Sequence, residues 1–191
     1  MSKGRLEAFS DGVLAIIITI MVLELAPPHE GDLTALIPLI PKFLSYVLSF
    51  VFLGIYWNNH HHLWQAVERV NGTVLWANLH LLFWLSLIPF ATGWMGENHF
   101  STFPVALYGL VLWFSALAYF IMVRVLMSQH HKDSVLATAI SGGGKERVSL
   151  IIYTAAIPLA FIFSWIALAL YVTVAIMWLI PDRRIENKIT K

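Results

Sequence analysis

A short polar motif, Ser10-Asp11-Gly12, stands at the head of a long hydrophobic run and is the first candidate for chemistry in this sequence. The run continues to Leu25, so Asp11 lies near one end of a predicted membrane helix. An ionisable side chain in such a helix is costly unless it faces protein or water and has a partner. We therefore expect Ser10 and Asp11 to hydrogen-bond to neighbouring helices and hold the first helix in place.

Three consecutive histidines, residues 60–62, end the second hydrophobic run on the same predicted membrane side as Asp11. We expect one of them, His61, to pair with Asp11. A metal site is the competing interpretation, but adjacent helical residues point about 100° apart. They therefore cannot converge on one ion as an i, i+4 pair does, and we expect no metal site. Asn78, in the third run, is expected to hydrogen-bond between helices.

One face of the first helix carries a stripe of residues with helical spacing. Its members, at about 100° per residue, are Gly12, Ile16, Thr19, Ile20 and Leu23. Asp11 lies about 140° from this stripe, so if the stripe faces a pore, Asp11 faces the subunit's own helices. Apolar periodicity alone favours packing or lipid contact, and nothing in the stripe itself indicates ions. Glu24 follows the stripe and is either a charge at a pore mouth or an interfacial charge.

The composition requires lipid as the solvent for much of the chain. Of its 191 residues, 59% are hydrophobic and 12% charged, whereas a soluble domain is about half apolar and a quarter charged. A net charge of +1 gives no reason to expect nucleic acid, and the absence of cysteine excludes disulfides and thiolate sites. No Ser/His/Asp arrangement, intramembrane carboxylate pair or phosphate loop is present, so we expect neither an enzyme nor a cofactor.

Six segments are apolar enough to cross a bilayer, which takes about 20 helical residues. We predict an all-α membrane protein with one domain, residues 1–191. The last two segments divide a run of 33 residues near Phe163–Ser164, and five helices is the alternative. The predicted spans are 6–25, 41–59, 74–95, 104–127, 148–163 and 164–180.

The basic residues give an independent test of this topology. With the N-terminus inside, 11 of the 12 Lys and Arg residues fall on the cytoplasmic side, and only Lys42 does not. Such an excess is typical of cytoplasmic loops, so both termini are predicted to be cytoplasmic in a multi-pass protein of the cell membrane. Five helices would leave Arg183 and Arg184 outside, which favours six. The cytoplasmic set is Lys3, Arg5, Arg69, Arg124, Lys132, Lys145, Arg147, Arg183, Arg184, Lys188 and Lys191.

The motif Arg5-x-x-x-Phe9-Ser10-Asp11-Gly12, with the run that follows it to Glu24, resembles the first-helix signature of one family. That family is transmembrane protein 175, the endosomal and lysosomal potassium channel, in its bacterial branch. The resemblance extends through residues 57–61, 78–92 and 181–184, and so covers nearly the whole chain.

The resemblance implies a homotetramer in the lipid bilayer, with four copies of the first helix around a potassium-conducting pore. The family's constriction residues fall on Ile16, Thr19 and Leu23, with Ile20 also lining the pore. Gly12 and Glu24 would lie at the pore mouths. A structural polar network would comprise Arg5, Ser10, Asp11, His61 and Asn78. An apolar neck would then favour potassium modestly over sodium, without a filter of backbone carbonyls.

Two other classes of function stay open at this point. A secondary transporter, proton-coupled through Asp11 and His61, is the first alternative. A non-conducting scaffold is the second, suggested by the short loops and by the many aromatic residues near helix ends.

Overall fold

The protein is described by a computed structural model that covers residues 2–65, 67, 70–129 and 144–179. These residues form helices joined by short connections. The predicted residue 180, the tail 181–184 and six basic residues (Arg69, Lys132, Arg183, Arg184, Lys188 and Lys191) lie outside the described part. The helices are α1 (Lys3–Leu23), η1, a 3-10 helix (Leu33–Leu39), α2 (Ile40–Gln65), α3 (Gly72–Ser86), α4 (Ile88–Glu97), α5 (Thr102–Ser128), α7 (Lys145–Ala160) and α8 (Ser164–Leu179).

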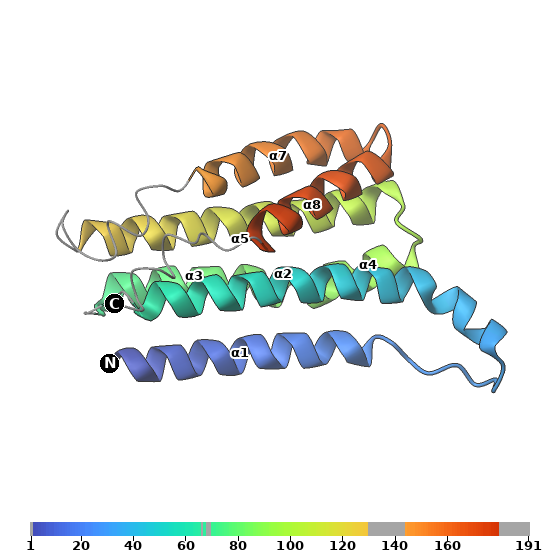
Figure 1. Cartoon of the computed structure of the whole chain (residues 1–191), viewed down its shortest axis with the longest axis horizontal. Helices are drawn as coiled ribbons and strands as arrows, with labels where there is room; N and C mark the ends of the chain where they lie inside the picture. The colour runs from blue at the N-terminus through green and yellow to red at the C-terminus, as the bar shows by residue number, and fades with distance from the viewer. Residues whose placement is uncertain (1, 66, 68–69, 130–143, 180–191) are drawn as a thin grey trace.

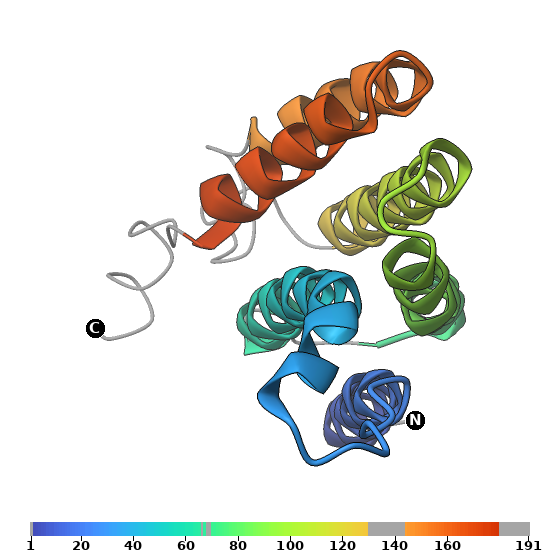
Figure 2. The ribbon, with the colours of Figure 1, turned by 90° about the vertical axis from the view of Figure 1, so that its right-hand side faces the viewer.

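The helices run up and down along the long axis of the molecule (Figure 1). α1 packs against α2, α3 and α4, and α5 packs against α3 and α4 on the other side. The α7–α8 hairpin covers α5 at the far side of the bundle, with α8 also touching α2. The end-on view therefore shows α1 at one edge of the molecule and α7 and α8 at the opposite edge (Figure 2).

Proline residues set several helix boundaries. α1 ends four residues before Pro27, and Pro38 lies inside η1 just before α2 begins. The third predicted span, 74–95, is interrupted at Leu87, where α3 gives way to α4. The cause is Pro89, which has no N–H to donate to the carbonyl of residue 85 and whose ring crowds that carbonyl. α3 and α4 still follow one another in nearly the same direction (Figure 1).

Within the described part of the chain, four segments are long and apolar enough to cross a membrane: Lys3–Leu23, Leu33–Gln65, Gly72–Glu97 and Thr102–Ser128. The predicted run 148–180 contains two helices, α7 and α8, joined by residues 161–163. Each has 16 residues, which gives a length of about 24 Å, short of the ~30 Å hydrocarbon core.

A cluster of buried hydroxyl groups joins three helices deep in the bundle. The Ser49 hydroxyl lies 2.6 Å from Thr92 Oγ1 and 2.9 Å from Tyr108 Oη. Thr92 also donates to the carbonyl of Ile88 at 2.7 Å. This cluster joins α2, α4 and α5. Because hydrocarbon offers no water to satisfy such groups, the bonds hold these three helices in one register.

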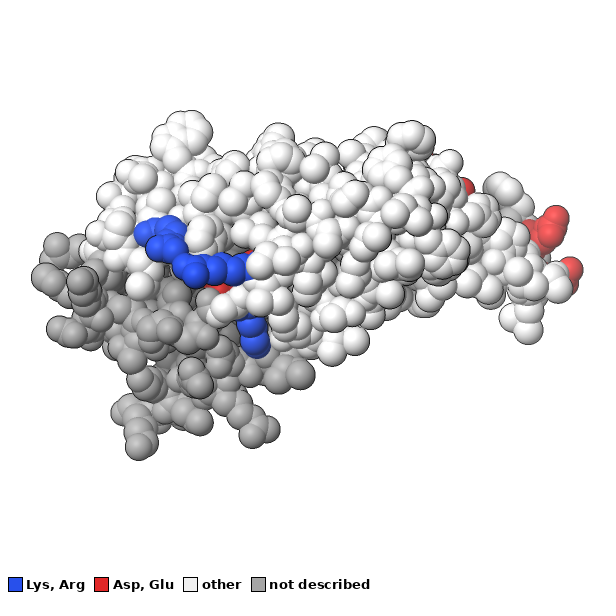
Figure 3. Space-filling model, turned by 90° about the horizontal axis from the view of Figure 1, so that it is seen from above, with Lys and Arg blue, Asp and Glu red and all other residues white. Residues whose placement is uncertain are grey.

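Charged side chains lie mainly at the two ends of the bundle, as seen on the face shown in Figure 3. The described basic residues at the end where α1 begins are Lys3, Arg5, Arg124, Lys145 and Arg147. The opposite end carries Glu24, Glu30, Asp32 and the ion pair of Lys42 with Glu97, whose Nζ–Oε1 distance is 2.9 Å. The described residues thus keep the charge asymmetry seen in the sequence.

Candidate functional site: the first helix and its polar anchor

α1 has two different faces within the protomer. Its buried face contains Leu14 and Met21, each 1% exposed, and packs into the core. Its other face carries the predicted stripe, and there Ile16 is 58% exposed and Leu23 is 77% exposed. Gly12, Thr19 and Ile20 are exposed on the same side. The protomer thus leaves the whole stripe free for a neighbour, for lipid or for water.

Thr19 places an oxygen rather than a hydrogen on this exposed face. Its hydroxyl donates to the Ile16 carbonyl at 2.9 Å, a bond within the helix. Because the hydrogen is used in that bond, the lone pairs of Oγ1 stay available. An exposed Thr19 therefore offers an acceptor, which suits a cation.

Ser10 joins the buried face of α1 to α2 and α3 through a chain of polar side chains. Ser10 Oγ accepts from Asn78 Nδ2 at 3.0 Å and donates to the Leu6 carbonyl at 2.9 Å. Asn78 Oδ1 lies 2.8 Å from His60 Nε2, and Trp64 Nε1 lies 2.7 Å from the same nitrogen. All of these side chains are buried. We name this set (Ser10, Asn78, His60 and Trp64) the polar anchor.

His60 stands at the centre of the polar anchor. Its Nε2 faces an acceptor, Asn78 Oδ1, and a donor, Trp64 Nε1. In a neutral imidazole, a ring nitrogen that carries a proton donates a hydrogen bond, and a ring nitrogen without a proton accepts one. The ring therefore donates to Asn78 in one tautomer and accepts from Trp64 in the other, so at any moment one of the two contacts is not a hydrogen bond.

The predicted pairing of Asp11 with His61 is wrong. Asp11 Oδ1 instead accepts from Trp57 Nε1 at 3.1 Å. His61 stacks on the Trp57 ring, with centroids 6.1 Å apart, and its Nε2 lies 2.9 Å from Gln65 Nε2. Trp57 and His61 share one face of α2, four residues apart, and the longer indole reaches α1 first. Among the described residues Asp11 and His61 therefore share Trp57 as a neighbour and form no direct hydrogen bond with each other.

The other predicted site residues are spread along α1. Arg5 is exposed. Among the described residues, neither Arg5 nor His61 makes a hydrogen bond to the polar anchor. Gly12 has open space around it, so no packing there requires a glycine. Glu24 turns toward α4, with Oε2 3.4 Å from the position that a Cβ on Gly93 would take. Together with Lys42 it borders a small hollow at this end of the bundle.

Sequence reasoning missed three residues that hold α1: Trp57, His60 and Trp64. The signal for His60 was available in the phase of α2. Ser45 and Ser49 are both buried, and His60 lies 11 residues after Ser49, which is about three full turns of helix. A histidine in phase with them has to face the core, whereas His61 is turned about 100° away. Among the described residues, no three His, Cys, Asp or Glu side chains are placed to share a metal ion.

Comparisons with known proteins identify relatives of this chain. The family model described as endosomal/lysosomal potassium channel TMEM175 matches residues 5–89, which include both the stripe and the polar anchor. A Chryseobacterium sp. (strain P1-3) protein named potassium channel is 55% identical over 189 residues, covering 99% of this chain and 98% of its own. A mouse protein named endosomal/lysosomal proton channel TMEM175 is 26% identical, covering 89% of this chain and 37% of its own.

A solved structure has the same fold. The crystal structure of a lysosomal potassium-selective channel TMEM175 homolog from Chamaesiphon minutus superposes with a TM-score of 0.80 at 27% identity. The match covers 92% of this chain and 95% of the other. With a relative more than half identical over nearly its full length, this chain belongs to the TMEM175 channel family.

Proposed function

We propose that this chain is one subunit of a homotetrameric potassium channel, with residues 1–191 forming a single channel domain. Four α1 helices would surround the pore, which a lone protomer of this kind does not contain. The observation that carries the proposal is the exposed stripe on a helix whose opposite face is fixed by the polar anchor. The names of the bacterial relative and of the solved structure support potassium as the ion, and no other ligand or cofactor is needed.

The charge distribution supports an orientation in the cell membrane. The end where α1 begins carries Lys3, Arg5, Arg124, Lys145 and Arg147, whereas the other end is mainly acidic. Because cytoplasmic segments carry the excess of Lys and Arg, we place this end, with both termini, in the cytoplasm. α7 and α8 then complete six membrane-spanning segments, and their shortness would be met by local thinning of the bilayer.

In this proposal, Ile16 forms the narrowest ring. Four isoleucine side chains around an axis make an apolar constriction that closes by dewetting and conducts when it widens. An ion that enters has to shed part of its water. Sodium holds its water more tightly than potassium, so such a neck favours potassium modestly. The Thr19 oxygen, one turn further along, offers an acceptor to the partly dehydrated ion.

The test is a flux assay in proteoliposomes that compares potassium with sodium. Ile16→Asn replaces the apolar ring with a polar one, so we expect a larger flux of both ions and a potassium-to-sodium ratio closer to one. The matched control is Ile176→Asn on α8, a position with a similar exposed fraction, 55% against 58% for Ile16. Unchanged flux and ratio in Ile16→Asn, in protein that assembles normally, would rule out the neck.

A further inference from the structure

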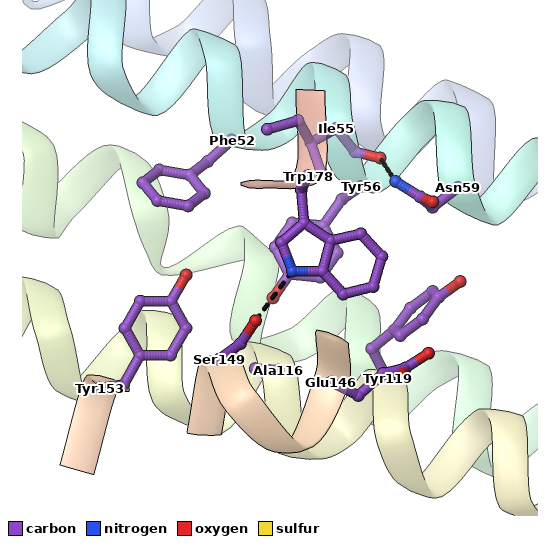
Figure 4. Close-up of a pocket in the computed structure, with 10 residues that line it drawn as sticks. All are labelled: Phe52, Ile55, Tyr56, Asn59, Ala116, Tyr119, Glu146, Ser149, Tyr153 and Trp178. Carbon is purple, nitrogen blue, oxygen red and sulfur yellow. Dashed lines mark hydrogen bonds between the residues drawn. The ribbon is translucent and has the colours of Figure 1, made fainter. Parts of the chain in front are cut away.

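Inside the bundle, the described helices leave little room for a further partner. The hollow between α2, α5, α7 and α8 has a volume of about 30 Å³, enough for a few water molecules (Figure 4). Two polar side chains of its wall are already bonded, since Trp178 Nε1 donates to Ser149 Oγ and Asn59 Nδ2 donates to the Ile55 carbonyl, both at 2.8 Å. A surface that needs a partner lies instead at the end of the bundle where α1 stops, on η1.

η1 is mainly apolar and is not covered by its own protomer. None of its seven residues is buried; Leu33 is 84% exposed and Ile37 is 61% exposed. In a 3-10 helix the side chains at i and i+3 lie above one another, which divides η1 into three rows. The rows are Leu33, Leu36 and Leu39; Thr34 and Ile37; and Ala35 and Pro38. Only Thr34 contributes a hydroxyl, so η1 has no polar face to turn to water.

The lengths of the helices place η1 beyond the hydrocarbon. α1 has 21 residues and is about 31 Å long, which already equals the ~30 Å thickness of a hydrocarbon core. Glu24, directly after α1, and Lys42, near the start of α2, border the same small hollow, so the two helices are level there. η1 precedes α2 and therefore lies past the end of α1, as Figure 1 shows. Acyl chains do not reach an apolar segment in this position.

η1 also turns toward the side of the molecule where the stripe of α1 is exposed. In Figure 1 it bends from the line of α2 toward α1 and away from α7 and α8. The end-on view shows η1 and the loop before it, residues 24–32, near the edge formed by α1 (Figure 2). In the proposed tetramer this edge lies next to the axis. The η1 segments of the four subunits would therefore come together around the outer mouth.

The head-group layer of the bilayer is a poorer partner for this segment. Helices that lie on a membrane surface carry Lys and Arg on a polar face, and Trp and Tyr mark the membrane interfaces. Residues 25–41 contain no Lys, Arg or aromatic residue. The charged residues that precede η1 are the carboxylates Glu30 and Asp32. An apolar surface of the same chain suits η1 better.

We propose that η1 is a subunit contact, packed against residues 23–40 of neighbouring copies of this chain. The inference rests on the proposed tetramer and extends it. The stripe of α1 meets its copies inside the membrane, whereas η1 meets its copies outside the hydrocarbon and lengthens the passage beyond Leu23. The apolar side chains of η1 leave water when the subunits assemble, which stabilises the tetramer.

Cysteine crosslinking of the full-length protein in proteoliposomes tests this contact, because the chain has no cysteine of its own. Ile37→Cys and Leu33→Cys each place one thiol on η1. A short bis-maleimide should join such subunits into covalent dimers, since one thiol per subunit can link only two of them. The matched control is Ile162→Cys, 78% exposed, in the α7–α8 connection at the same end but the opposite edge of the molecule (Figure 1). This control should give several-fold less dimer.

The mass in detergent and the potassium flux of the same variants, without crosslinker, separate this inference from the proposed function. All three substitutions are at exposed positions, so we expect tetramers that conduct. If they do, yet Ile37→Cys and Leu33→Cys give no more dimer than Ile162→Cys, then η1 is not a subunit contact and the proposed channel stands. A protein that is monomeric and does not conduct would overturn the proposed function and this inference together.

Discussion

Side-chain hydrogen bonds fix how α1 is rotated about its own axis. Ser10 is fully buried and bonded to Asn78, while Asp11, the next residue, lies at the edge and is bonded to Trp57. Two adjacent positions thus attach α1 to α3 and α2 from two directions. Any rotation of the helix that turned the stripe inward would break both bonds.

Removing the Ser10 hydroxyl should loosen this attachment. Ser10→Ala leaves the Asn78 amide without its acceptor in a buried site, so we expect a loss of about 1–2 kcal/mol in stability. The measurement is the thermal unfolding of the detergent-solubilised protein. The control is Ser86→Ala, whose hydroxyl is exposed and bonds only to the carbonyl of Phe83 at 2.7 Å. If both variants unfold at the same temperature as the unchanged protein, the polar anchor does not stabilise the fold.

At the scale of residues, the sequence shows which polar residues take part in hydrogen bonds better than it shows which partners they bond to. The motif at residues 10–12 and the amide of Asn78 are visible as polar interruptions of apolar runs, and the structure joins Ser10 to Asn78. Which of the three adjacent histidines faces the core depends on the rotational phase of α2. An error of one residue in the predicted phase turns the prediction by about 100°. Side-chain reach matters too, because Trp57 and not His61 reaches Asp11.

At the scale of helices, close approach is made possible by small residues. α7 and α8 pack on each other and on α5, and their residues Ala156, Ala160 and Ala167 are fully buried. Gly109 on α5 gives the closest case, because a Cβ there would collide with the Tyr171 hydroxyl of α8. The absence of a side chain at Gly109 is therefore needed for α8 to dock on α5.

Gly109→Ala should push α8 away from α5. We expect a destabilisation of about 1–3 kcal/mol from overpacking, measured as a lower unfolding temperature. Adding Tyr171→Phe removes the hydroxyl that meets the new Cβ, so the double variant should recover part of the loss. Gly54→Ala is the control, since nothing lies within 4 Å of its added Cβ. A Gly109→Ala protein as stable as this control would contradict the proposed close packing.

Helix boundaries follow from the sequence where proline marks them. Pro89 explains the break between α3 and α4, and it can be read in the sequence although the third span is predicted as continuous. The division of the last apolar run depends on length and on the positions of Arg183 and Arg184. The structure has a helix on each side of residues 161–163. The packing of Tyr171 on Gly109 could not be predicted, because it joins residues 62 positions apart in the sequence.

At the scale of the whole molecule, α1 lies at the edge of the bundle with one face uncovered (Figure 2). The periodicity of the stripe predicts this face, yet isoleucine and leucine are equally suited to lipid and to a dewetting neck. What favours a shared axis is the combination of exposure, the Thr19 acceptor and the family membership. In the proposed channel, copies of this protomer would enclose the passage together.

The most direct measurement is water accessibility along α1, for which the chain is convenient because it has no cysteine. Single cysteines at Ile16, Thr19 and Leu23 are compared with cysteines at Leu14, Ile17 and Met21, on the buried face. In proteoliposomes, a charged thiol reagent added from the water should block potassium flux through the first three variants and leave the last three conducting. If Ile16→Cys and Leu23→Cys resist the charged reagent but react with a lipid-soluble maleimide, then the stripe faces lipid and α1 does not line the pore.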